Sequence, residues 1–196
     1  MLDKIKNLWL DFEKKNPKLS QWVREGGLFL IISNLVTVIR GLLKNWLMLI
    51  PAIAALGLGA WGWPNATFEL FGKEITFMVI GFGEGIENGG GLAGTVAFWI
   101  ASFLCEALNF FMQRKFTFRS NGNLAFQGSI YFVAWCFVTL IVNSVFSIAS
   151  GLLSGLLPQE IINVAMSFLQ GGISMVIFFF VNKIIFTDKK ADEAAA

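Results

Sequence analysis

The sequence predicts an all-α integral membrane protein with four transmembrane helices, arranged as two related two-helix units behind an N-terminal interfacial amphipathic helix. The chain of 196 residues is 56% hydrophobic and contains 21 Phe and 7 Trp, so it has too little polar surface to cover a water-soluble globule. Its charged residues gather between four long apolar runs, as they do in multi-pass membrane proteins. A degenerate repeat predicts the two-unit arrangement, because two of these runs end in an amide, a cation and an aromatic residue: NFFMQRKFTF at 109–118 and FFFVNKIIF at 178–186.

Residues 1–25 form the predicted interfacial helix. Apolar residues recur there at helical spacing while lysines take most of the other positions: Leu2, Ile5, Leu8, Trp9 and Phe12. Pro17 is expected to end this helix, because proline interrupts the backbone hydrogen bonding of a helix interior.

Residues 26–187 form the predicted four-helix transmembrane domain. The four apolar runs are 26–58, 94–111, 129–157 and 161–185. At ~1.5 Å per residue the first run exceeds the ~30 Å hydrocarbon core, so we expect a bend at Pro51. A long connection at 59–93 follows, in which FELFGKEITF predicts a β-hairpin that turns around Gly72 and Lys73.

Charge placement predicts the orientation in the membrane. Lys and Arg crowd the N-terminal region, the 112–128 loop and the tail at 188–196, whereas the other two connections carry mostly Glu. By the positive-inside rule both termini are cytoplasmic, and the 59–93 loop is extracytoplasmic. Four helices make a thin wall for a translocation path, so we expect a homo-oligomer. The charge bias supports the same orientation at every connection, which favours parallel protomers over a dimer of opposite orientations.

This assignment of spans places three charged residues within the hydrocarbon, away from the helix ends: Arg40, Lys44 and Glu106. Each costs at least ~2.5 to 3.5 kcal/mol near the centre of a membrane helix, so something must offset that cost. Counted from the cytoplasmic ends, Arg40 and Glu106 lie at depths of ~20 Å and ~12 Å, within reach of a long Arg side chain. The sequence therefore predicts an Arg40–Glu106 ion pair.

Two interpretations of these charges stay open. In the first, the pair is structural and Lys44 extends toward the outer interface. In the second, Arg40 and Lys44 share one helix face, four residues apart, and two cations against one carboxylate attract an anionic headgroup such as a phosphate. Asn34 and Thr37 on the same helix could line a polar path, or could make contacts between helices.

The cytoplasmic helix ends carry further candidates for binding phosphate or sugar oxygens. These residues are amides and cations: Asn109, Gln113, Arg114, Lys115, Asn182 and Lys183. Asn109 and Gln113 lie four apart on one helix face. Basic residues at such positions also arise for topological reasons alone.

Composition argues against several classes of protein. The chain has no His, and its two Cys lie singly in apolar segments, so it offers no ligand cluster for a metal and no cofactor site. Without paired carboxylates or a nucleophile beside a base, we expect no enzyme. A net charge of +2 does not indicate nucleic acid binding.

At NFFMQRKFTF the chain resembles the GtrA-like family of small four-helix membrane proteins, whose second helix ends in a pattern close to N-F-x-x-N-R-x-W-x-F. Four positions match: Asn109, Phe110, Arg114 and Phe118. Gln113 replaces the second Asn, and Phe116 replaces the Trp. The family's last helix ends in N-[KR]-x-W-x-F, which the chain matches with one residue fewer at Asn182, Lys183 and Phe186. The resemblance covers most of 26–187.

The resemblance implies translocation of a polyprenyl-phosphate lipid carrier, such as undecaprenyl phosphate bearing a single sugar. The carrier would cross the cytoplasmic membrane of a bacterium, for glycosylation of cell-surface polysaccharide or teichoic acid. Arg40 and Lys44 would then draw the phosphate through the membrane, while the amides and cations at the helix ends load it from the cytoplasmic face.

Two alternatives remain. A small proton-coupled cation exporter would use Glu106 as its titrating site, although neighbouring Arg40 and Lys44 favour the ionised carboxylate and repel cations. A non-transporting subunit that docks a membrane glycosyltransferase would tolerate neutral replacement of both cations.

Overall fold

The computed structural model describes residues 2–59, 66–77, 81, 84–86 and 89–186, without the side chains of residues 2–5, 76, 77, 159, 160, 163 and 167. The predicted tail at 188–196 and parts of the 59–93 connection lie outside the described residues. Four helices in the described part are long and apolar enough to cross a membrane, which agrees with the four apolar runs of the sequence. The placement of the N-terminal helix in the membrane interface stays a prediction.

The first two helices meet at Pro17. Helix α1 spans Leu2–Lys15 and α2 spans Pro17–Leu47, so residue 25 lies within α2. The predicted boundary there, between the interfacial segment and the transmembrane domain, stays a prediction. Pro17 ends α1 as predicted and also opens α2, because the first helical position needs no backbone N–H. The break expected near Pro51 is confirmed, since α2 ends at Leu47 and the short helix α3 spans Pro51–Ala54.

The predicted hairpin is also confirmed. Strands β1 (Ala66–Leu70) and β2 (Lys73–Phe77) pair antiparallel around a two-residue turn, in which Phe71 and Gly72 both have positive φ. Two-residue hairpin turns of this kind match the twist of the strands. The hairpin packs on the end of α5: Ile75 is buried against Gly151, and Lys73 Nζ donates to the carbonyls of Leu152 and Ser154.

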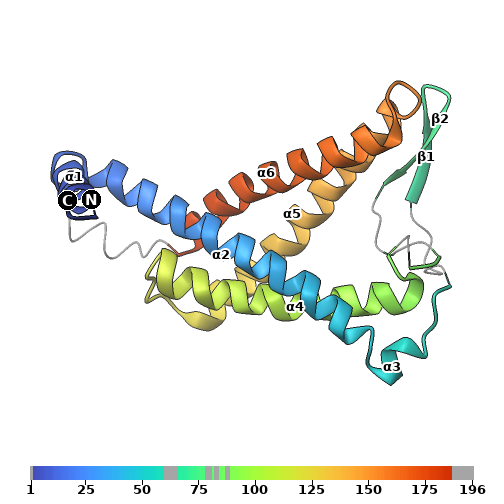
Figure 1. The fold of residues 1–196 in the computed structure, drawn as a ribbon, viewed down its shortest axis with the longest axis horizontal. Coiled ribbons are helices and arrows are strands. Elements are labelled where there is room, and N and C mark those ends of the chain that lie inside the picture. The colour runs from blue at the N-terminus through green and yellow to red at the C-terminus, as the bar shows by residue number, and fades with distance from the viewer. Residues whose placement is uncertain (1, 60–65, 78–80, 82–83, 87–88, 187–196) are drawn as a thin grey trace.

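The other membrane-crossing helices are α4 (Gly91–Met112, continued by the π-helix η1, Gln113–Thr117), α5 (Leu124–Leu153) and α6 (Gln159–Phe186). Helix α2 packs along α4, and α5 packs along α6. Figure 1 shows that the two pairs lie close together at one end and diverge toward the hairpin. Whether the pairs descend from one duplicated unit stays a prediction.

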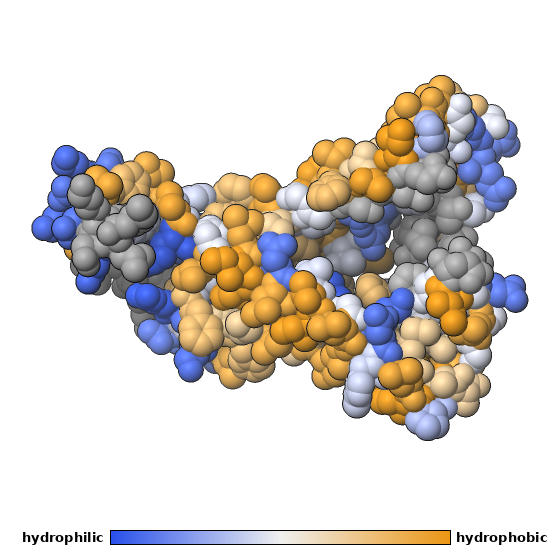
Figure 2. All heavy atoms as spheres, viewed as in Figure 1, coloured by the Kyte–Doolittle hydropathy of each residue, from blue (hydrophilic) through white to orange (hydrophobic). Residues whose placement is uncertain are grey.

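Helix α4 carries the most buried face of the bundle. Ala97 and Ala101 are fully buried against Leu47 of α2, because small side chains let two helices approach closely in lipid. A second cluster joins the two pairs at the convergent end, where Phe110, Tyr131 and Phe186 pack together. Apolar side chains cover most of the outer face in Figure 2, as expected for a surface in contact with lipid.

Candidate functional site

A cavity of about 840 Å³ lies between the two helix pairs. Its walls are part aromatic and part polar. The aromatic side chains come from all four long helices: Phe29, Phe98, Trp99, Trp135, Phe146 and Phe178. The polar ones are mostly hydroxyls and amides: Ser33, Asn34, Thr37, Ser102, Asn109, Thr139, Asn143, Ser147, Ser150, Gln170 and Ser174. In Figure 2 the hollow between the diverging pairs shows hydrophilic side chains, unlike the lipid-facing surface around it.

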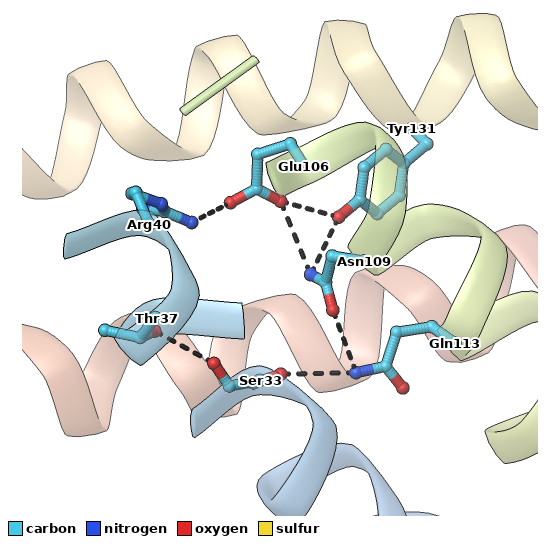
Figure 3. A network of polar contacts seen from close by, with 7 residues as sticks. All are labelled: Ser33, Thr37, Arg40, Glu106, Asn109, Gln113 and Tyr131. Carbon is cyan, nitrogen blue, oxygen red and sulfur yellow. Dashed lines mark hydrogen bonds and ion pairs between the residues drawn. The ribbon is translucent and has the colours of Figure 1, made fainter. Parts of the chain in front are cut away.

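The charged residues of the cavity wall are Arg40 and Glu106. They form the ion pair that the depth argument predicts, through Arg40 Nη2 and Glu106 Oε1 (Figure 3). The Arg40 side chain is 26% exposed and the Glu106 side chain 8%. The Arg40 side chain is therefore the more accessible of the two to a ligand in the cavity, and the Glu106 carboxylate is nearly buried.

Two neutral donors hold the other carboxylate oxygen. Tyr131 Oη donates to Glu106 Oε2 at 2.8 Å, and Asn109 Nδ2 lies 3.4 Å from the same oxygen. Asn109 Nδ2 also donates to Tyr131 Oη at 3.0 Å. Glu106 thus accepts from three side chains on three helices, an arrangement that fixes its position.

The polar network continues along one face of α4 and η1. Gln113 Nε2 donates to Asn109 Oδ1 at 3.3 Å and to Ser33 Oγ at 3.2 Å (Figure 3). Thr117 Oγ1 donates in turn to Gln113 Oε1 at 2.6 Å. The residues from Glu106 to Thr117 follow each other at spacings of three and four, so one helix face carries a ladder of polar groups from the cavity toward the convergent end.

Arg40 keeps hydrogen-bonding capacity beyond its bond to Glu106. A guanidinium has five N–H donors, and the buried Nε of Arg40 has no partner among the described residues. The charges of the pair cancel, so attraction of an anion rests on these remaining donors and on the exposure of Arg40. A phosphate oxygen is the kind of acceptor that an Arg fork suits.

Lys44 does not line the cavity with Arg40. Its Nζ donates to the backbone carbonyl of Gly89 at 2.9 Å, in the segment that leads into α4. The loop before α4 thus supplies Lys44 with a carbonyl, and a shared anion between the two cations stays a prediction. Asn34 and Thr37 do line the cavity, and each donates to a carbonyl of its own helix rather than to another helix.

The cations at the convergent end hold structural positions. Arg114 bridges Gln127 Oε1 at 2.9 Å and the Gly122 carbonyl at 2.7 Å, and so fixes the loop between η1 and α5. Lys183 pairs with Glu25 Oε2 at 2.7 Å. Lys115 is exposed and lies over the ring of Phe116. The structure therefore does not gather these cations at one binding site.

Sequence reasoning missed Tyr131 and Glu25. Tyr131 is the chain's only tyrosine, and a lone phenol inside an apolar run is the one signal that could have marked it as a partner of Glu106. Glu25 directly precedes the first apolar run. Because the predicted membrane boundary lies there, no intramembrane partner was expected for it, and its ion pair with Lys183 was not predicted. Comparison with family models, curated proteins and solved structures finds no match to this chain.

Proposed function

We propose that this protein binds a lipid with an anionic phosphate headgroup, of the polyprenyl-phosphate class bearing a single sugar, and moves it across the membrane. The observation that carries the proposal is Arg40, a partly exposed cation in the wall of a polar and aromatic cavity inside a bundle of apolar helices. The resemblance to the GtrA-like family supports the same class of substrate.

The ion pair explains how a binding cation can stay in this environment. Glu106 offsets most of the free-energy cost of placing the Arg40 charge among apolar helices. Tyr131 and Asn109 bind the carboxylate oxygen of Glu106 that Arg40 does not bind. The pair is then neutral as a whole, and a phosphate can reach those N–H groups of Arg40 that are exposed to the cavity. The site binds an anion without storing an unpaired buried charge.

The cavity walls suit the rest of such a headgroup. About 840 Å³ lies within the range of ~300 to 1,000 Å³ that is usual for ligand pockets. Aromatic faces such as Trp99 and Trp135 can cover the apolar face of a sugar ring, while hydroxyls and amides can bind its oxygens. The isoprenoid tail would stay with the exposed apolar surface of the helices.

The proposal also includes an orientation and a location. By the positive-inside rule, the basic residues in the N-terminal region and in the 112–128 loop support a cytoplasmic convergent end and an extracytoplasmic hairpin. The membrane would be the cytoplasmic membrane of a bacterium, and the protein a parallel homo-oligomer.

Native mass spectrometry from mild detergent tests the proposal. Wild type should retain polyprenyl phosphate or its glycosylated form, and Arg40→Gln should retain at least ~10-fold less, since a hydrogen bond to a charged group contributes ~1.5 to 3 kcal/mol. Arg40→Gln/Glu106→Gln should also lose the lipid while keeping the fold, because it leaves no unpaired charge. Lys18→Gln, an exposed lysine at the start of α2, is the matched control. Equal retention by wild type and both Arg40 variants would remove Arg40 from the site.

The two alternatives predict different results. The cation exporter needs a Glu106 that exchanges protons, yet this carboxylate already accepts from Arg40, Tyr131 and Asn109. Cationic dye uptake that depends on pH and is lost in Glu106→Gln would favour it. A folded wild type that retains no lipid, together with co-purification of a membrane glycosyltransferase, would favour the docking subunit.

A further inference from the structure

At the end opposite the hairpin, the two helix pairs meet through the Phe110–Tyr131–Phe186 cluster and, on another side, through a small set of side chains from α2 and α6. We call this set the α2–α6 contact: Trp22, Glu25, Phe29, Phe179 and Lys183. The Lys183 ammonium lies 2.7 Å from Glu25 Oε2 and 3.8 Å from the centre of the Trp22 ring. The rings of Phe29 and Phe179 meet edge to face at 5.5 Å.

Chemically, this contact is well suited to open and close. It is one ion pair with aromatic side chains around it, whereas α2 and α4, or α5 and α6, pack along their lengths. Breaking it exposes charged and aromatic groups at the basic end of the bundle, where water and headgroups can solvate them. The contacts within each pair can stay intact during such a motion.

The polar face of the cavity continues behind the α2–α6 contact. On α6, Gln170, Ser174 and Phe178 line the cavity at spacings of four, and Asn182 follows at the same spacing. On α4 the cavity-lining face with Glu106 and Asn109 continues into Gln113 and Thr117 of η1, as described above. The sealed half of the bundle thus carries a polar interior that is unusual for a structural core.

Asn182 differs from the other buried amide of this interior, Gln113, because its side chain has no hydrogen-bond partner in the part of the chain that the structure describes. It is 0% exposed, and neither its Nδ2 nor its Oδ1 has a partner among the described residues. Gln113, equally buried, bonds to Ser33, Asn109 and Thr117. Leaving an amide unpaired costs ~1 to 3 kcal/mol, which a leucine of similar volume would avoid.

We propose that the sealed half of the bundle is the second half of the translocation path, in which Asn182 forms a subsite for the oxygen-rich headgroup once the α2–α6 contact opens. The amide offers one acceptor and two donors to phosphate oxygens or sugar hydroxyls. The inference rests on the proposed function for what moves along the path, but the path itself can be tested without any substrate.

Accessibility labelling tests the path. Ser174→Cys in a Cys105→Ala/Cys136→Ala background is reconstituted in vesicles of known orientation and exposed to a membrane-impermeant maleimide on the α1 side. We expect slow labelling in this parent and at least tenfold faster labelling after Lys183→Gln or Glu25→Gln. Lys18→Gln, which removes a lysine outside the contact, should label at the parent rate. Labelling at the parent rate in both Lys183→Gln and Glu25→Gln would refute the proposal that the α2–α6 contact closes the path.

Asn182→Leu tests the subsite with paired measurements of stability and transport of polyprenyl phosphate in the same vesicles. We expect a melting temperature equal to or above that of the parent, because an unpaired amide is removed, together with at least tenfold slower transport. Parent transport rates, or a lower melting temperature, would overturn the subsite. A parent that moves no polyprenyl phosphate, but whose labelling responds to Lys183→Gln, would refute the proposed function and keep the path.

Discussion

Replacing Tyr131 by Phe would remove one hydroxyl from the centre of the polar network and little else. The ring is buried between Phe110 and Phe186, and Phe fills the same volume without leaving a cavity. The hydroxyl donates to Glu106 at 2.8 Å and accepts from Asn109 at 3.0 Å. The variant therefore isolates the contribution of this hydroxyl to the position of Glu106.

Two magnitudes bound the expected loss of stability. Hydrogen bonds to charged groups contribute ~1.5 to 3 kcal/mol in proteins generally, whereas bonds between membrane helices average ~0.6 and reach ~1.7 kcal/mol. Asn109 still lies within 3.4 Å of the carboxylate, and Arg40 still pairs with it, so no group is orphaned. We expect a loss of ~1 to 1.5 kcal/mol, which corresponds to a fall of ~2 to 6 °C in melting temperature for a chain of this size.

Reversible unfolding in mild detergent measures this difference. Ser144→Ala is the matched control, because that hydroxyl only donates to the Leu140 carbonyl within its own helix. We expect the control to change stability by less than ~0.5 kcal/mol. Equal stability of the two variants would show that the Tyr131 hydroxyl does not fix Glu106, and would refute the network as drawn in Figure 3.

The remaining predictions concern charge and backbone. Arg40→Gln alone should destabilise the fold by ~3 kcal/mol, at the lower end of the ~3 to 5 kcal/mol for a broken buried pair because Arg40 is partly exposed. Arg40→Gln/Glu106→Gln should recover most of this loss in the same unfolding assay, and additive losses would contradict the pairing. Gly91→Ala should cost at least ~2 kcal/mol, since Gly91 has φ 54° and a Cβ there would lie 2.2 Å from the Leu58 carbonyl oxygen. Gly41→Ala, in open space within α2, should instead stabilise by ~0.5 to 1 kcal/mol, and equal effects at the two glycines would refute this.

Hydropathy locates the membrane-spanning part of a helix better than the helix itself. The third apolar run was predicted to begin at residue 129, but α5 starts at Leu124 because Asn123 caps it by accepting from Phe126 N at 2.9 Å. Likewise α2 starts at Pro17, long before its apolar run. Polar first turns carry no hydropathy signal, so only caps and prolines reveal them.

The Arg40–Glu106 pair could be predicted because two constraints act on it together. Each charge must be neutralised at its depth, and the depths follow from the span ends. Lys44 obeys the same electrostatics, but the loop that supplies its carbonyl has no pattern in the sequence. Tyr131 carries no charge, and Glu25 lies at the predicted membrane boundary. Neither residue therefore needs a neutralising partner by the argument that predicts the Arg40–Glu106 pair.

The hairpin belongs by chain order to one helix pair and by contact to the other. It lies between α3 and α4 in the sequence, yet Ile75 and Lys73 attach it to the end of α5 (Figure 1). It is therefore a mechanical tether across the wide end of the bundle. If the hairpin moved with the first pair as the wide end spread, the bonds of Lys73 to the carbonyls of Leu152 and Ser154 would have to break, so these two bonds resist the spreading.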